Sequence, residues 1–181
     1  SYETEKAGTF SFGYDFSHTT GTDYIEYVRA LSNGSTSNTE MKNSLYLSYD
    51  YTWNNLSLGA GLRYEHIRSD LKENSSNKNQ NQTYHNFLPS VSLSYNTESL
   101  QQSLTYSVHT ERPPFGVMND NAVYTDRFTY QKGNLYLKQA LTHDLNYMLF
   151  YKFLFFNLNY THTQNPLITA FYSMPGNSAV T

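Results

Sequence analysis

The chain has 181 residues, of which 38% are hydrophobic and 15% are charged, and its formal net charge is -3. That charge offers no basic footprint for nucleic acid, and the lack of cysteine excludes disulfides, thiolate metal sites and cysteine nucleophiles. Aromatic residues reach 17%, yet the mean hydropathy is -0.64, so Ser, Thr, Asn and Gln supply the polarity. This balance is typical of strands with one apolar face and one neutral polar face.

Apolar and polar residues alternate with a period of two along most of the chain, which predicts strands. The pattern begins with Phe10, Phe12, Tyr14 and Phe16. It continues over six further segments: Ser44–Tyr51, Leu56–Glu65, Phe87–Tyr95, Leu100–Val108, Leu141–Leu149 and Leu154–Tyr160. No segment holds a convincing 3.6-residue stripe. The sequence therefore predicts an all-β chain, an antiparallel up-and-down meander of about seven to nine strands.

The connections alternate between short and long. Tight turns are expected at Trp53–Asn55, Asn96–Ser99 and Tyr151–Phe153. Long polar loops are expected at residues 31–40, 70–82 and 113–139, followed by a polar tail from residue 164. The aromatic run of residues 148–156 is too short for a spanning helix of about 20 residues, and Lys152 divides it as a turn would. Membrane barrels place short turns on one side and long loops on the other, so the pattern predicts part of a transmembrane β-barrel.

Alternation also assigns faces to the polar residues. Asp50, Arg63, Glu65 and Asp144 oppose the apolar positions and are expected to face a lumen. The loops 70–82 and 113–139 are candidate solute-facing elements. The candidate solute-facing residues are thus Asp50, Arg63, Glu65, Glu111, Arg112 and Asp144. Tyrosines at strand ends fit either an interface belt or cross-strand pairs: Tyr64, Tyr95, Tyr106, Tyr147 and Tyr160.

No motif in the sequence indicates catalysis or a cofactor. The six histidines show no metal-ligand spacing, and no phosphate loop, nucleophile elbow or EF-hand loop occurs. We therefore expect no enzyme activity, no metal and no cofactor.

Three landmarks resemble one family. Residues 87–95 read Phe-Leu-Pro-Ser-Val-Ser-Leu-Ser-Tyr, residues 111–115 read Glu-Arg-Pro-Pro-Phe, and residues 128–138 lead through Gly133-Asn134 to Leu137-Lys138. In this order they resemble the large Bacteroidetes outer-membrane β-barrel family related to TonB-dependent receptors. Leu135 and Gln139 stand where that family usually has proline, which implies a less rigid loop.

The resemblance implies the barrel portion of a TonB-dependent receptor that takes up an unidentified solute across the outer membrane of a Gram-negative bacterium. Residues 1–181 would form a single barrel segment, cut at both ends, of a barrel with twenty-odd strands. The plug domain, the N-terminal periplasmic module and the TonB-contacting segment would lie outside it. The implied partners are outer-membrane lipid, the plug, TonB and the solute.

Two alternatives stay open at this point. One is a soluble β-sandwich or small β-barrel that acts as a binding module. The other is a passive porin-like or structural outer-membrane barrel. An isolated arc of a large barrel would have two unpaired edges, so the chain alone is expected either to close into a small barrel or to form edge-to-edge dimers.

Overall fold

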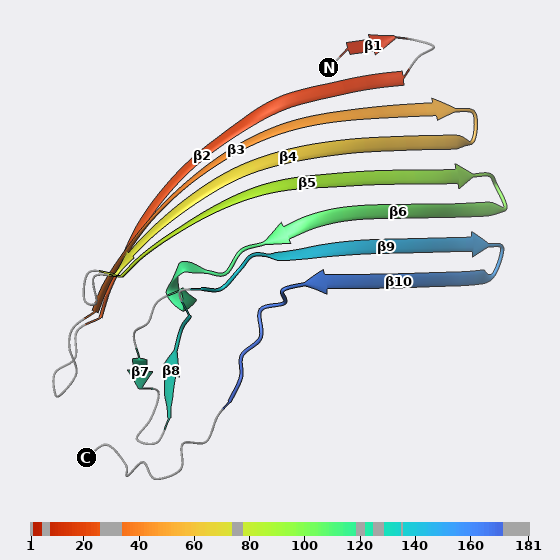
Figure 1. Ribbon diagram of the computed structural model, residues 1–181. Coiled ribbons are helices and arrows are strands. Elements are labelled where there is room, and N and C mark those ends of the chain that lie inside the picture. The colour runs from red at the N-terminus through yellow and green to blue at the C-terminus, as the bar shows by residue number, and fades with distance from the viewer. Residues whose placement is uncertain are drawn as a thin grey trace.

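The computed structural model describes residues 2–4, 8–25, 34–73, 78–118, 122–124, 129–134 and 136–171. They form one antiparallel sheet in the order β1-β2-β3-β4-β5-β6-β9-β10 (Figure 1). Its seven long strands are β2 (Gly8–Ile25), β3 (Gly34–Trp53), β4 (Leu56–Glu73), β5 (Lys78–Asn96), β6 (Leu100–Glu111), β9 (Ala140–Tyr151) and β10 (Leu154–Gln164). The predicted all-β meander is confirmed.

Three short elements complete the described chain. Strand β1 (Tyr2–Thr4) pairs with the beginning of β2. Between β6 and β9 lie a 3-10 helix, η1 (Phe115–Val117), and a separate hairpin of β7 (Ala122–Tyr124) and β8 (Tyr130–Lys132). The sheet is curved and open, with β1 and β10 at its edges (Figure 1), so the described residues do not close into a small barrel. Among them, no helix has the length and the apolar run that a bilayer crossing requires.

The three predicted tight turns are confirmed and lie at one end of the sheet (Figure 1). Asn54 has φ 49° and Lys152 has φ 52°, the left-handed region that two-residue hairpin turns use because it matches the twist of the strands. The turn between β5 and β6 is closed by Thr97, whose backbone amide donates to the Leu100 carbonyl at 2.7 Å. We call this end the turn end and the opposite end the loop end.

Two of the predicted long loops are wrong. Strand β3 begins at Gly34, β4 runs to Glu73 and β5 begins at Lys78, so only residues 74–77 separate β4 from β5. The extra residues pair in register, as Leu71 with Gln80 does. The alternation is weak there because most side chains on both faces are polar. A strand needs an apolar outward face only where that face meets the bilayer core. The predicted loops at 31–40 and 70–82 are therefore largely strand.

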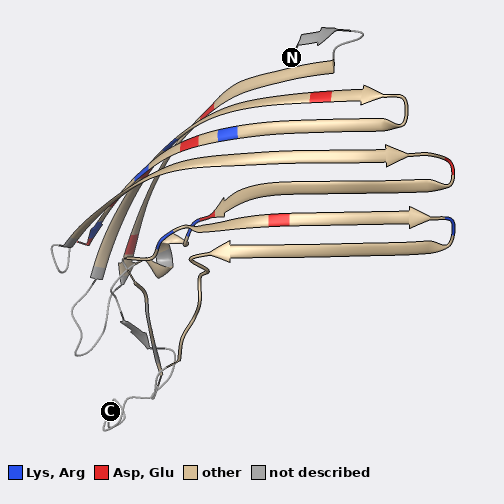
Figure 2. Cartoon of the chain, turned by 45° about the vertical axis from the view of Figure 1, so that its right-hand side comes forward, with Lys and Arg blue, Asp and Glu red and all other residues tan. Residues whose placement is uncertain are grey.

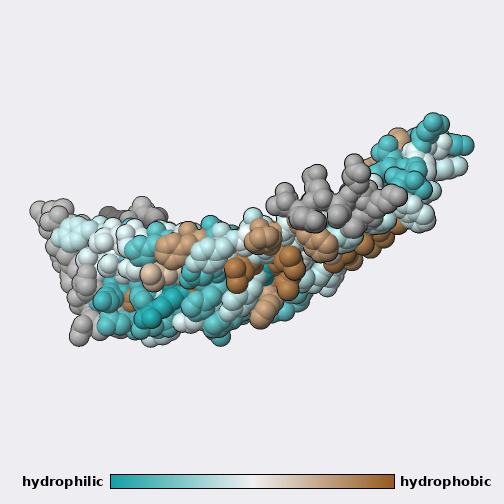
Figure 3. Space-filling view, turned by 90° about the horizontal axis from the view of Figure 1, so that it is seen from above, coloured by the Kyte–Doolittle hydropathy of each residue, from teal (hydrophilic) through white to brown (hydrophobic). Residues whose placement is uncertain are grey.

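The register gathers apolar side chains on one face, here called the outward face. One row crosses six strands through Tyr51, Leu58, Leu93, Leu104, Tyr147 and Leu158. Figure 3 shows apolar residues gathering over the middle and along one edge of the sheet, and hydrophilic residues toward the loop end. These side chains have no second layer against them in the described structure: Phe12 is 80% exposed and Leu45 is 56% exposed.

The outward apolar face has the height of a bilayer core. On β4 it runs from Leu56 to Tyr64, nine residues, or about 30 Å of strand at about 3.3 Å per residue. A strand tilt of about 40° reduces this to about 23 Å, close to the apolar band of about 25 Å in outer-membrane barrels. In the described strands no charged residue lies on the outward face between the turns and this level. Charged residues are sparse on the turn-end halves of the strands (Figure 2). We call this surface the apolar band.

The strands differ in how far they continue beyond the apolar band. Strands β2 to β5 extend well past it, whereas β6, β9 and β10 end soon after it (Figure 1). The pairing of β5 with β6 stops at Ser90 and Ser107, so the sheet forks above that point. Strands β2 to β5 thus form a tall wall at the loop end, and the connection from β6 to β9 starts beside it.

Candidate solute-facing site on the inward face

The inward face at the level of the apolar band is lined by small polar side chains. One row runs through Asp50, Gly59, Ser92, Thr105, Asn146 and Asn159, and the next through Ser48, Gly61, Ser90, Ser107, Asp144 and Thr161. The members of the two rows on β3 to β6 border an open groove of about 210 Å³. The glycines shape it, because a Cβ on Gly59 would lie 2.9 Å from Oδ1 of Asp50. The face is polar and mostly uncharged there.

A network of four charges lies on the inward face toward the loop end. The Arg63 guanidinium is 2.8 Å from Oε1 of Glu65 and 3.2 Å from Oδ2 of Asp15. Nζ of Lys42 lies 3.9 Å from Asp15 and 4.0 Å from Glu65. The Glu65 side chain is only 8% exposed, so it needs these cations to offset the loss of hydration. Ser44 donates a further hydrogen bond to it.

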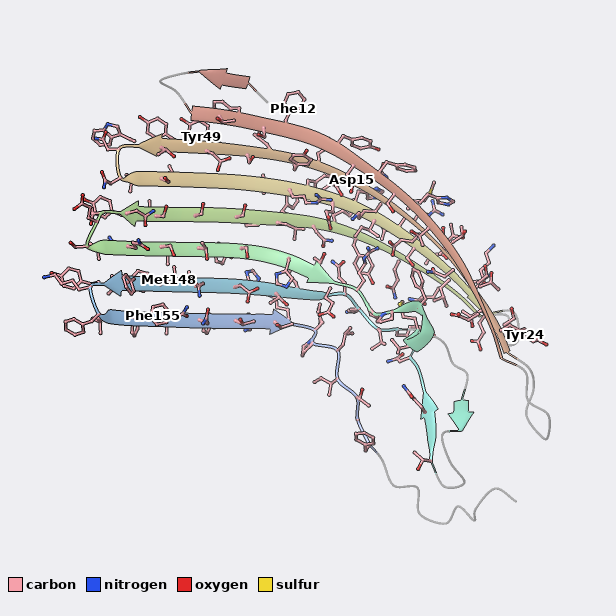
Figure 4. The ribbon with its side chains drawn as sticks, turned by 180° about the vertical axis from the view of Figure 1, so that it is seen from behind. Phe12, Asp15, Tyr24, Tyr49, Met148 and Phe155 are labelled. Atoms are coloured by element: carbon pink, nitrogen blue, oxygen red, sulfur yellow. The ribbon has the colours of Figure 1, made fainter. Side chains whose placement is uncertain are left out.

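A second polar cluster lies on β6, β9 and β10. Asp144 accepts a hydrogen bond of 2.6 Å from Thr161, and Nδ1 of His109 is 3.3 Å from its other oxygen. Below it, Asn146, Asn157 and Asn159 bond to one another through their amides. Toward the turn end the inward face becomes apolar at Met148 and Phe155, which Figure 4 shows on the last two strands.

The connection from β6 to β9 folds over the inward face of the tall wall. We call its residues 112–118 and 136–140 the covering segment. Arg112 forms an ion pair with Glu40 of β3, and the side-chain amides of Asn86 and Gln139 bond to each other in both directions. The Gln82 side chain donates to the Leu137 carbonyl at 3.5 Å. These polar contacts therefore tie two strands, β3 and β5, to one connection.

An apolar contact joins the same surfaces. Leu71 of β4 is 1% exposed and packs with Met118, which is 6% exposed, and with Leu137. Ile67, also on the inward face of β4, is 1% exposed. Phe115 reaches across to within 4.0 Å of the position where a Cβ on Gly21 would stand. Figure 4 shows side chains crowding at the loop-end halves of β2 to β5 beside η1. Most of the buried side chains of the described chain lie on the loop-end halves of β3 to β5 or on the covering segment.

Burial in this contact changes two proton equilibria. Desolvation raises the pKa of the Tyr84 phenol, and a hydrogen bond with the Gln139 backbone partly opposes that effect. Desolvation lowers the pKa of the Arg112 guanidinium, which nevertheless stays protonated at neutral pH because arginine is so strong a base. When the covering segment is docked at neutral pH, Tyr84 is therefore neutral and Arg112 is charged.

The structure places the six predicted residues on or beside the inward face. It brings Arg63 and Glu65 into contact but keeps Asp50, on β3, apart from Asp144, on β9. Glu111 is exposed at the end of β6, and Arg112 is bound to Glu40 rather than free in a loop. That these residues contact a solute stays a prediction.

Sequence reasoning missed three partners, which are Asp15, Lys42 and Glu40. Period-two alternation with the outward residues Phe16 and Leu45 would have placed these three residues on the inward face, together with Arg63 and Glu65. The described residues contain no group of three or more potential metal ligands.

Comparison with known proteins gives one match. No curated protein and no solved structure is similar to the chain. The model of a family described as "Outer membrane protein beta-barrel family" matches residues 1–181. This match and the unpartnered apolar band together contradict the soluble alternative. The chain therefore belongs to the outer-membrane protein β-barrel family and resides in the outer membrane of a Gram-negative bacterium.

Proposed function

We propose that the chain forms part of the wall of a barrel that imports a polar solute, and that this import is TonB-dependent. The observation that carries the proposal is the inward face: a polar wall at the level of the apolar band, with a segment tied across its outer end. The TonB-dependent part rests on the resemblance of residues 87–95, 111–115 and 128–138 to the Bacteroidetes receptors. In the folded chain the first of these lies on β5, and the second begins the covering segment. The third is described only in part.

The proposed role is translocation rather than catalysis, and the full-length protein would supply a plug domain that TonB displaces. The covering segment would narrow the outer entrance. Below it the solute would pass the groove between Ser48 and Ser107, with Asp50 and Asp144 on either side. Glu111 would lie at the rim, where it is exposed.

The charge of the inward face supports a solute class. Eight acidic residues whose side chains are described lie on it: Asp15, Asp23, Glu40, Asp50, Glu65, Glu73, Glu111 and Asp144. Lys42 and Arg63 are the basic residues on this face whose side chains are described, and Arg112 reaches it from the covering segment. An acidic wall repels anions and concentrates cations. We therefore propose that the solute is uncharged or cationic.

Cysteine accessibility tests the assignment of the two faces to lumen and lipid. The chain has no cysteine, so Ser92→Cys or Leu93→Cys introduces one reactive site into it, and any cysteine elsewhere in the full-length protein is first replaced by serine. In the full-length protein in vesicles, a membrane-impermeant maleimide should label Ser92→Cys and leave Leu93→Cys unmodified. The reverse labelling would refute the lumen assignment.

TonB dependence needs a second measurement, because both kinds of barrel predict the same labelling. In cells, the labelling rate of Ser92→Cys from outside should rise when TonB is energised and fall when the proton gradient is collapsed. A passive porin would show constant labelling and a steady conductance in planar bilayers. That result would retain the pore wall and refute the TonB-dependent import.

A further inference from the structure

Histidines mark the loop-end boundary of the apolar band. Of the six histidines, all of them described, five lie on the outward face and only His109 lies on the inward face. Each of the five lies two residues beyond an apolar or aromatic side chain on the same face: His18 after Phe16, His66 after Tyr64, His85 before Phe87, His143 before Leu145, and His162 after Tyr160. On β2 and β9 one more such side chain follows beyond the histidine, Tyr24 and Leu141. We call these five residues the histidine belt.

Tyrosines orient two members of the belt in the same way. The Tyr64 hydroxyl is 2.8 Å from Nδ1 of His85, and the Tyr106 hydroxyl is 2.9 Å from Nδ1 of His143. In each case the tyrosine lies on the neighbouring strand and bonds diagonally toward the loop end. A hydroxyl that donates to Nδ1 leaves the ring proton on Nε2. The imidazole then presents an N–H donor away from the tyrosine, even when it is uncharged.

The belt also contains two cross-strand pairs. His66 faces His85 with 4.8 Å between ring centroids, and His143 faces His162 with 6.3 Å. Two protonated rings at such distances repel each other, and an anion between them would offset that repulsion. The outward face therefore carries two cross-strand pairs of ring donors.

The charged groups around the belt favour an anion. On β4 the outward face continues with Arg68, Asp70 and Lys72, and the Arg68 guanidinium is 3.2 Å from the Asp70 carboxylate. On β3 the outward neighbours are Asn43 and Met41. On β6, β9 and β10 they are uncharged: Val108, Thr110, Leu141 and Gln164. Asp70 is thus the single acid near the belt on the described outward face, and Arg68 neutralises it.

We propose that the histidine belt binds the phosphate groups of anionic lipids in the outer leaflet. The belt lies at headgroup height, because the apolar band below it spans the bilayer core and the long connections lie on the outer side of such barrels. Imidazole N–H groups donate to phosphate oxygens, and Lys72 adds a fixed positive charge to the same surface, where Arg68 and Asp70 offset each other. This inference depends on the membrane location of the chain and is independent of what the barrel transports.

Lipid-dependent thermal stability tests the proposal. The full-length protein in dodecyl maltoside micelles is unfolded with and without dioleoyl phosphatidylglycerol, and with dioleoyl phosphatidylcholine, which has the same chains but no net charge. The wild type should gain more stability from phosphatidylglycerol. A His66→Phe/His85→Phe/His143→Phe/His162→Phe variant, which keeps the rings and removes the nitrogens, should lose at least half of that gain. The matched control is His109→Phe, on the inward face, which should keep it.

Further measurements distinguish lipid binding from binding of free phosphate and from loss of folding. Inorganic phosphate should not replace the lipid, because the site includes the bilayer interface, and equal stabilisation by free phosphate would refute the lipid assignment. If the quadruple variant does not fold, His66→Arg/His85→Arg keeps the donors and should preserve or enlarge the lipid effect. Retention of the full lipid effect without the four imidazoles, an equal loss in His109→Phe, or loss of the effect in the arginine variant would each overturn the proposal.

Discussion

Arginine at Val91 tests the orientation of the sheet most directly. Val91 lies in the middle of the apolar band, between Ala60 and Tyr106 on the neighbouring strands. It is four residues from Phe87 and four from Tyr95, about 13 Å of strand each way. A tilt of about 40° converts this to a depth of about 10 Å, which is close to the bilayer midplane.

An arginine at that depth costs about 2–4 kcal/mol, which lowers the ratio of folded to unfolded protein by about 30- to 900-fold. The assay is urea unfolding of the protein in phosphatidylcholine vesicles, followed by the fluorescence of Trp53, the single tryptophan. Ser92→Arg, one residue further on and facing inward near Asp50, should change stability by less than about 0.5 kcal/mol. A near-neutral Val91→Arg together with a costly Ser92→Arg would reverse the two faces.

Three further predictions concern the inward face. Glu40→Gln leaves the part-buried Arg112 without its carboxylate and should weaken docking of the covering segment by about 1–3 kcal/mol, seen as faster hydrogen exchange at residues 115–118. The covering segment should stay docked below about pH 10 and become less firmly docked as the pH rises through the raised pKa of Tyr84, because the docked state favours the neutral phenol. The rate of protease cleavage within the covering segment measures this loss of docking. Gly13→Ala places a Cβ against the Tyr46 ring and should destabilise the fold by about 1–3 kcal/mol in urea unfolding.

Matched variants separate these effects from general damage. Glu111→Gln removes an exposed acid at the start of the same connection and should leave exchange unchanged; equal effects at both positions would contradict the Glu40 reasoning. Tyr84→Phe should abolish the step in cleavage above pH 10, and an unchanged step would assign it to another group. In the double variant Gly13→Ala/Tyr46→Ala the clash is gone, so fully additive costs would show that the ring was never the obstacle.

The strands and turns were predictable because their signals are local. A strand that faces lipid on one side and water on the other alternates strictly, as Leu56–Tyr64 does. The tight turns show as Asn54-Asn55 or Lys152 between apolar ends. The signal weakens above the bilayer, where most residues of β3 to β5 are polar on both faces, and there strands were mistaken for loops.

The covering segment was not predictable because its contacts are distant in sequence. Glu40 and Arg112 are 72 residues apart, and nothing near either residue specifies the other. One local signal was present: the apolar positions of β4 change face between Tyr64 and Ile67, and Leu71 follows on the new face. Such a change indicates that another segment covers the inward side at that height.

The separation of charge between the two faces also bears on how the sheet assembles. Adjacent residues on a strand face opposite sides, so a pairing error of one residue would turn Asp50, Arg63 and Asp144 toward lipid. A basic residue turned toward lipid destabilises the sheet by up to about 2–4 kcal/mol at the midplane. A pairing error of two residues keeps every charged side chain on the inward, hydrated face. The membrane can therefore reject odd errors without any contact to a folding factor. Pairing errors of two residues must be prevented by the short hairpins, because a two-residue turn fixes the register of the strands that it joins.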